Sequence, residues 1–305
     1  MSFRVADLWR WDGTLDRGPY LFIGLAGFAL KHNLDRFLAS WIFQRPWGLF
    51  NYWIPLDRAV RLTELKLDEA LFLGTMVALA LPFIYVGVAL TVGRLRAIDL
   101  PLWLAALFFV PVVNLFFFLL LSVLPSKPAA TETAPAGRAA RLLDRLVPTG
   151  VIGSALVSLL LTLLFGLLIV VVGVEVFFEY GWGLFVGLPF AQGLLSVLLY
   201  ARHERRGLGS CLLVSFLSVL FTALALTALA IEGLICVFMA APLGVILAAI
   251  GATLGYFIQL APRRLAETPA AMLVVVLSVP GMMGLEALEP APAPLFEVST
   301  TVEVD

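Results

Sequence analysis

The sequence is poor in charged residues and in the side chains that most often carry chemistry. Asp, Glu, Lys and Arg make up 13% of its 305 residues, against about 25% in ordinary soluble domains, and 20 basic residues nearly balance 21 acidic ones. Without an excess of positive charge, a nucleic acid is not expected as a partner. With only two histidines, and two cysteines (Cys211 and Cys236) near opposite ends of consecutive apolar segments, we expect no metal, cofactor or disulfide.

Motifs of the common enzyme classes are also missing. The sequence has no Gly-x4-Gly-Lys phosphate loop and no Gly-x-Ser-x-Gly nucleophile elbow. His203-Glu204 begins like a zinc-protease motif, but Gly207 stands where the second histidine ligand is needed. The sequence therefore favours a protein that is not an enzyme.

Apolar residues are what the sequence has in excess. They form 61% of the chain, against about 45 to 50% in soluble proteins, which is more than a water-soluble core can bury. A membrane-spanning helix needs about 20 such residues, and about seven to eight segments of this kind are predicted. Six approach that length cleanly (70–92, 101–124, 149–174, 183–201, 208–231 and 233–260), and two are marginal (18–43 and 270–285). The predicted fold class is all-α, a polytopic transmembrane helical bundle.

A stretch rich in Pro and Ala interrupts the apolar segments near the middle of the chain. It divides the sequence into four predicted parts: an N-terminal membrane domain (1–126), a cytoplasmic linker (127–147), a C-terminal membrane domain (148–288) and a tail (289–305).

The distribution of Lys and Arg predicts the orientation of the C-terminal half, because basic loops stay on the cytoplasmic side. The linker and the loops at 202–206 and 263–264 are basic, whereas the loop at 175–179 and the one at Glu232 are acidic. We therefore expect a multi-pass protein of a bacterial inner membrane, with its C-terminus on the outer face.

The orientation of the N-terminal half stays open at this point. If 101–124 crosses the membrane, the N-terminus lies outside. If 101–124 is re-entrant, bent near Pro111 and Asn114, the N-terminus lies inside, and the basic residues are distributed almost equally well.

Three short motifs lie within the first 126 residues. They are Gly13-Thr14-Leu15-Asp16-Arg17 followed by Tyr20, Gly93-Arg94-Leu95-Arg96-Ala97, and Trp103 and Pro111 ahead of Pro125-Ser126. In these motifs the chain resembles the bacterial membrane family called domain of unknown function 805. The family has a histidine and an aspartate where this chain has Arg96 and Ala97, so no role of those two groups transfers. The resemblance implies a membrane domain and brings no established activity with it.

The last ten residues, 296–305, alternate apolar and polar side chains in the manner of a half-buried strand. They weakly resemble the opening strand of a polyketide-cyclase-like domain. This resemblance implies that a soluble domain truncated at Asp305 would stand on the outer face.

A run of polar residues interrupts the first apolar segment. It reads Lys31-His32-Asn33-Leu34-Asp35-Arg36. Lys31 and Asp35 are one helical turn apart and can form an ion pair, and His32 beside a cation suits proton movement near neutral pH. The alternative is that only 18–30 is immersed and that the polar run lies at the interface with its side chains extended to water.

Two other groups of residues are candidates for simpler roles. Gly244, Gly251 and Gly255 have the spacing that lets helices pack closely, and packing within the chain is expected over dimerisation. Glu175, Glu179 and Glu232 are all predicted outside and could hold Ca²⁺. Acidic residues are ordinary in outer loops, so no metal site is predicted.

Together these features favour a non-enzymatic scaffold or anchor for an outer-face domain. Its expected partners are the lipid bilayer and, as a ligand, a lipid or an apolar small molecule. The alternative is a small-molecule or ion transporter or channel that uses the polar run at 31–36. The sequence does not indicate an oligomeric state.

Overall fold

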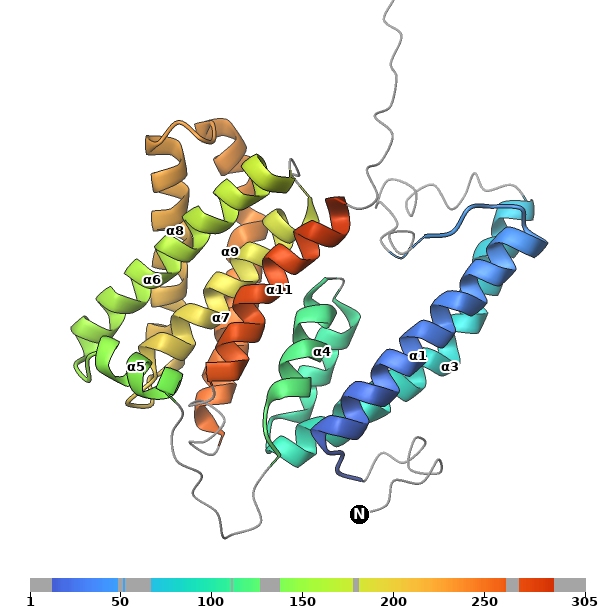
Figure 1. Cartoon of the computed structure of the whole chain (residues 1–305), viewed down its shortest axis with the longest axis horizontal. Helices are drawn as coiled ribbons and strands as arrows, with labels where there is room; N and C mark the ends of the chain where they lie inside the picture. The colour runs from blue at the N-terminus through green and yellow to red at the C-terminus, as the bar shows by residue number, and fades with distance from the viewer. Residues whose placement is uncertain are drawn as a thin grey trace, which may run out of the picture.

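The structure, a computed structural model, describes residues 13–48, 52, 67–110, 112–126, 138–177, 181–261 and 269–287. Nearly all of these residues form helices, and none of them lies in a strand (Figure 1). The predicted all-α class is therefore confirmed.

Six helices of the described ranges are long and apolar enough to cross a membrane. They are α3 (Leu67–Ile98), α6 with its π-helical end η6 (Val151–Phe177), η7 with α7 (Gly183–Tyr200), α8 (Leu208–Ala228), α9 (Leu234–Leu260) and α11 (Pro269–Ala287). The predicted number of about seven to eight segments is thus not confirmed. The first helix, α1 (Arg17–Phe37), contains the charged run, and the stretch 101–124 is broken in two.

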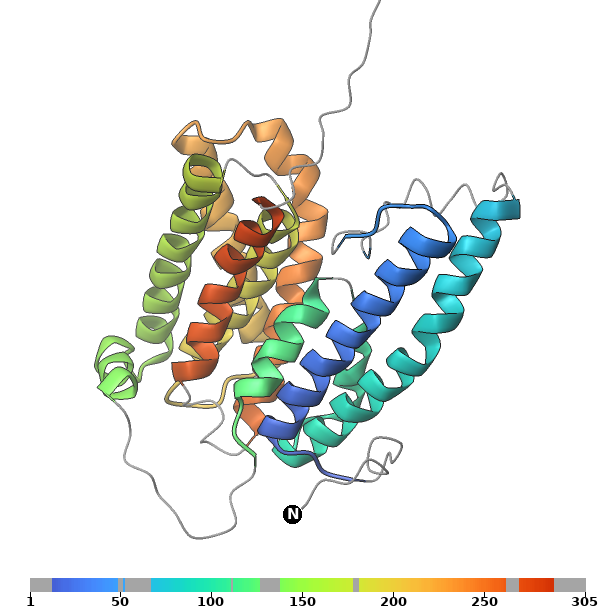
Figure 2. The same cartoon turned by 45° about the vertical axis from the view of Figure 1, so that its right-hand side comes forward.

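In the broken stretch, two short helices run in opposite directions. They are the 3₁₀ helix η5 (Leu102–Phe109) and α4 (Val113–Val123). The Asn114 N–H donates to Val110 O at 3.0 Å and closes the turn between them. Val112 takes a φ of 67° there, which is strained for a β-branched residue and costs about 1–3 kcal/mol. Both ends of this η5–α4 hairpin lie at the same end of the molecule (Figures 1 and 2).

The hairpin connects a pair of long helices to the second half of the molecule. α1, extended by the π-helical turn η2 (Leu38–Ile42), lies alongside α3, and the hairpin packs against both (Figure 2). On its other side, the ring of Phe116 in α4 lies 5.7 Å from that of Phe190 in α7. Trp103 of η5 meets Phe257 of α9 edge to face at 5.1 Å.

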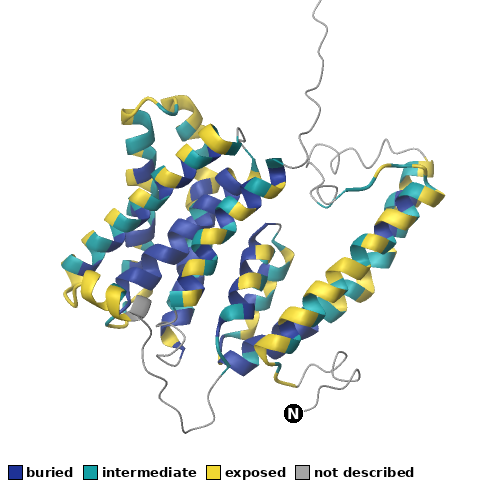
Figure 3. Ribbon diagram, viewed as in Figure 1, coloured by how far each residue is buried: buried dark blue, intermediate teal, exposed yellow. Residues whose placement is uncertain are grey.

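Helix α7 occupies the centre of the second half, and α6, α8, α9 and α11 surround it (Figure 3). The approach of α9 is close enough to exclude a methyl group. A Cβ added at Gly193 would lie 2.2 Å from Ala248 O, and one at Gly251 would lie 2.2 Å from Phe190 O. The backbones of α7 and α9 therefore touch directly.

In helix α6 the apolar face is exposed and the polar face is buried, the reverse of a helix at the surface of a water-soluble protein. Every fourth residue of its buried stripe is small or polar, namely Ser154, Ser158, Thr162 and Gly166. Its exposed stripe consists of leucines, namely Leu156, Leu160, Leu164 and Leu168. An apolar exterior over a polar, small-residue interior is stable only where hydrocarbon is the solvent, so the chain is an integral membrane protein.

Residues 138–146, within the predicted linker, form a short helix, α5 (Arg138–Leu146). It lies at the same end of the molecule as the loop between α7 and α8 and the ends of the η5–α4 hairpin. The turn between α8 and α9 and the last turn of α11 lie at the opposite end (Figure 1).

Candidate functional site

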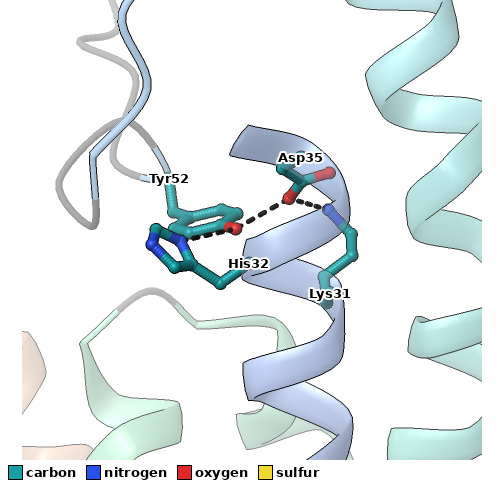
Figure 4. A network of polar contacts seen from close by, with 4 residues as sticks. All are labelled: Lys31, His32, Asp35 and Tyr52. Atoms are coloured by element: carbon teal, nitrogen blue, oxygen red, sulfur yellow. Dashed lines mark hydrogen bonds and ion pairs between the residues drawn. The ribbon is translucent and has the colours of Figure 1, made fainter. Parts of the chain in front are cut away.

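Three residues of the predicted polar run meet a tyrosine that follows α1. The Lys31 ammonium pairs with Asp35 Oδ2, as their spacing of four residues predicts for a helix. The Tyr52 hydroxyl donates to the same oxygen at 2.7 Å, and His32 Nδ1 lies 3.3 Å from that hydroxyl (Figure 4). We call Lys31, His32, Asp35 and Tyr52 the polar network.

The two remaining residues of the run point elsewhere. Arg36 is exposed, and Asn33 donates to the Ala29 carbonyl of its own helix at 2.8 Å. The charged members of the network are shielded from solvent, because Asp35 is 0% and the Lys31 side chain 14% exposed.

Aromatic rings surround the network. Trp47 meets the Tyr52 ring edge to face at 5.7 Å, and Phe28 lies 6.1 Å from it. The Lys31 ammonium sits 5.4 Å from the centre of the Tyr52 ring, a cation–π distance. These rings cover part of the network and lower the local dielectric constant, which strengthens its electrostatic interactions.

One polar atom of this site, the acceptor Asp35 Oδ1, has no hydrogen-bond partner among the described residues. Burial, followed by the hydrogen bond and negative charge of Asp35, raises the pKa of Tyr52 above its usual value. Tyr52 therefore keeps its proton and serves as the donor to Asp35 Oδ2.

Tyr52 and Trp47 were not predicted as members of this site. Both follow the first apolar segment, and nothing in their spacing connects them with Asp35. Only a tendency of aromatic residues to lie at membrane interfaces would have drawn attention to them.

A second buried charge brings the motifs of the N-terminal half together. Arg94 of α3 is fully buried and donates from Nε to Leu121 O at 2.9 Å, and from Nη2 to Leu124 O. From Nη1 it donates to Leu15 O at 3.1 Å and to Ser126 Oγ at 2.7 Å. One guanidinium thus holds the segment before α1 and the end of α4 against α3.

The surroundings of Arg94 match its charge. The last carbonyls of α4 carry the negative end of a helix dipole. The Ser126 hydroxyl donates to Asp16 Oδ1 at 2.9 Å, which brings a carboxylate into the same group. All of these contacts are internal to the chain, so Arg94 is a structural clamp.

The other motif positions lie around this clamp or outside it. The segment at Gly13 runs beside α3, with Gly13 O 3.5 Å from where a Cβ of Gly93 would be, and the Leu15 N–H donates to Gly93 O at 3.0 Å. Arg17 is exposed, Trp103 contacts α9 as described above, and Pro111 is outside the described residues.

The three glycines proposed for helix packing all face other helices of the same chain. Gly251 contacts the α7 backbone, as described above, and a Cβ at Gly255 would lie 2.9 Å from Val197 Cβ. Gly244 is packed less tightly, because a Cβ added there would lie 3.9 Å from the side chains of both Pro189 and Val219.

Hydrogen bonds between polar side chains join the central helices. Gln192 of α7 donates to Thr162 O of α6 at 3.1 Å and to Thr222 Oγ1 of α8 at 2.7 Å. Ser218 of α8 donates to Thr162 Oγ1 at 2.7 Å. Sequence reasoning missed this group, although a glutamine within an apolar segment is a usable signal for it.

The acidic residues of the predicted outer face do not assemble. Within the described ranges, no three metal-binding side chains come together, and Glu179 is outside those ranges. Glu286 near the end of α11 instead accepts a hydrogen bond from the Gly183 N–H at 3.1 Å, where η7 begins.

No family model, no curated protein and no solved structure matches this chain. The resemblance to domain of unknown function 805 rests on the motif residues alone and stays a prediction. What the fold establishes is the class: a helical integral membrane protein with six candidate spans in its described part.

Proposed function

We propose that the chain is a non-enzymatic scaffold or anchor in a bacterial inner membrane that carries a domain on the outer face. The direct contact of the α7 and α9 backbones is the observation that carries this proposal. Helices that touch at Gly193 and Gly251, and that are joined by the hydrogen bonds of Gln192, form a bundle suited to holding a fixed position. A lipid or an apolar small molecule is the ligand class that suits its surface.

The arrangement of charge supports an orientation for this anchor. Arg202, Arg205 and Arg206 lie in the loop between α7 and α8, at the end where α5 is found. Glu232 lies in the turn between α8 and α9 at the other end, where α11 also finishes. By the positive-inside rule the first end is the cytoplasmic one, which supports an outer-face position for the end of α11.

The same orientation favours a re-entrant η5–α4 hairpin. Both ends of the hairpin lie at the basic end, beside Arg94. We propose that α1 crosses the membrane in addition to the six candidate spans and that the N-terminus is cytoplasmic. The bent backbone at Val112 is buried among other side chains, which is the condition for non-helical backbone at membrane depth.

Paired reporter fusions test the orientation. Alkaline phosphatase fused after Asp305 should be active, and the same enzyme fused after Ala261, before α11, should be inactive. Fluorescent-protein fusions at the two sites should give the opposite pattern. An inactive phosphatase at Asp305 would rule out the outer-face anchor.

Cysteine labelling tests the hairpin separately. In a chain with Cys211 and Cys236 replaced by alanine, Thr14→Cys should react with a membrane-impermeant maleimide only after the membrane is opened. Labelling from the outside alone would show that 101–124 crosses the membrane.

The polar network supports a second candidate function, an ion or small-molecule transporter or channel. A fully buried carboxylate with one oxygen lacking a partner among the described residues is a binding position for a proton or a cation. In proteoliposomes that contain a pH-sensitive dye, a transporter would move protons down an imposed potential, Asp35→Asn would stop it, and the exposed Arg36→Gln would serve as control. An anchor gives the same signal as protein-free vesicles.

A further inference from the structure

We propose that α5 binds the headgroups of anionic phospholipids at the basic end of the bundle, through an arginine stripe that adjoins a leucine stripe. Arg141 and Arg145 are one helical turn apart and exposed. Leu142 and Leu146 form the adjacent stripe and are 60% and 49% exposed. A basic stripe beside an apolar one is the surface that lies at the boundary of headgroups and acyl chains.

The loop between α7 and α8 fixes the orientation of α5. Arg202 Nε donates to Asp144 Oδ1 at 2.9 Å, and the Arg202 side chain is almost completely buried. His203 Nε2 lies 2.7 Å from Val147 O, within hydrogen-bonding distance, and Arg206 Nη2 donates to Thr149 O at 3.2 Å. These contacts fix the orientation of the helix and of its connection to α6, and they leave the two stripes exposed.

The position of α5 along the bundle suits the same boundary. Only a short connection separates it from the start of α6, where Val151 and Ile152 are exposed apolar residues. The leucine stripe of α5 thus adjoins the surface of α6 that faces hydrocarbon. Leu143, on the remaining face, packs against the core.

The charges nearby favour an anion. Two carboxylates lie in this described region, and arginines of the α7–α8 loop engage both: Asp144 pairs with Arg202, and Glu204 pairs with Arg206 at 3.0 Å. Arg141 and Arg145 therefore present their charge outward, and each basic residue near an anionic surface contributes about 1 kcal/mol to binding.

Thermal unfolding of the detergent-solubilised full chain with added lipid tests the site, because a ligand of the folded state raises Tm. Phosphatidylglycerol should raise the Tm of the wild type, and phosphatidylcholine should not. In Arg141→Gln/Arg145→Gln the apparent affinity for phosphatidylglycerol should fall about thirty-fold, the effect expected of two such charges. The control Arg36→Gln removes an exposed charge near the other end of α1, away from the basic end, and should respond like the wild type.

Further arms separate a lipid from a free anion. Leu142→Ser/Leu146→Ser should also weaken the response to phosphatidylglycerol, because part of the affinity comes from the leucines. An equal rise of Tm with inorganic phosphate, or an unchanged response in either α5 variant, would overturn the proposal. Mass spectrometry of co-purified phospholipid gives a second readout, in which the arginine variant should lose phosphatidylglycerol. Neither measurement depends on whether the protein is an anchor or a transporter.

Discussion

The Arg94 side chain donates from Nε to the main-chain oxygen of Leu121, 2.9 Å away, so a residue near the end of α3 holds the last turn of α4. The same guanidinium reaches Leu15 and Ser126. The hairpin and the first helix therefore share one buried charge, and the removal of that charge should loosen both.

We predict that Arg94→Gln destabilises the protein by about 3–5 kcal/mol, the usual cost of breaking a buried charged network. The carbonyls of Leu121 and Leu124 would lose their donor. Arg94→Lys keeps the positive charge but lacks the several N–H donors of the guanidinium, so its Tm should lie between those of the wild type and Arg94→Gln. Thermal unfolding in detergent measures the effect, with the exposed Arg17→Gln as control. Equal Tm values for Arg94→Gln and Arg17→Gln would contradict the clamp.

We predict that replacing both members of the Lys31–Asp35 ion pair costs less stability than replacing Lys31 alone. Lys31→Met leaves the buried Asp35 carboxylate without its cation and should cost about 3 kcal/mol or more. Lys31→Met/Asp35→Asn removes both charges and should be more stable than the single variant. A double-mutant cycle by thermal unfolding measures the coupling. Simple additivity of the two substitutions would show that the pair contributes nothing.

Tyr52 predicts a loss of stability in alkaline solution. The pKa of Tyr52 is raised in the folded protein. The protonated hydroxyl therefore contributes its full share of stability below pH 10.0, the pKa in the unfolded chain, and this share is lost as the pH rises above that value. Other tyrosines and lysines also titrate there, so the quantity to measure is the difference in Tm between the wild type and Tyr52→Phe from pH 8 to pH 11. This difference should shrink or reverse above about pH 10. A constant difference would contradict the raised pKa.

The contact of α7 and α9 predicts that Gly251→Ala is disruptive. The added methyl would lie 2.2 Å from Phe190 O, which belongs to the packed backbone of α7. Overpacking of this kind costs about 1–3 kcal/mol or more. Gly281→Ala in α11 is the matched control, because a Cβ there meets nothing within 4 Å. A Tm for Gly251→Ala at or above that of the control would show that the helices can separate without cost.

The features that depend on local composition could be predicted from the sequence. The apolar run around Leu160 predicted α6, and the four-residue spacing of Lys31 and Asp35 predicted their ion pair. Contacts between distant parts of the chain could not be predicted in this way. Tyr52 reaches Asp35 and Gln192 reaches Thr222 because of how helices are placed, and no periodicity encodes that placement.

The stretch 101–124 shows where apolar length alone fails. Its composition suits a single span, and only Pro111 and Asn114 hinted at a bend. The end of this stretch is held by N–H donors of Arg94, which belongs to α3. Whether 101–124 forms one helix or two therefore depends on tertiary contacts.

Membrane proteins assemble in two stages, insertion of helices into the bilayer and association of the inserted helices. In α6 the exposed stripe serves the first stage and the buried stripe serves the second. The leucines at 156, 160, 164 and 168 drive entry into the bilayer, whereas Ser158 and Thr162 provide the bonds that recruit its neighbours. Replacement of Ser158 by leucine would thus ease insertion and impair assembly. In this helix, greater hydrophobicity would produce a well-inserted but poorly folded chain.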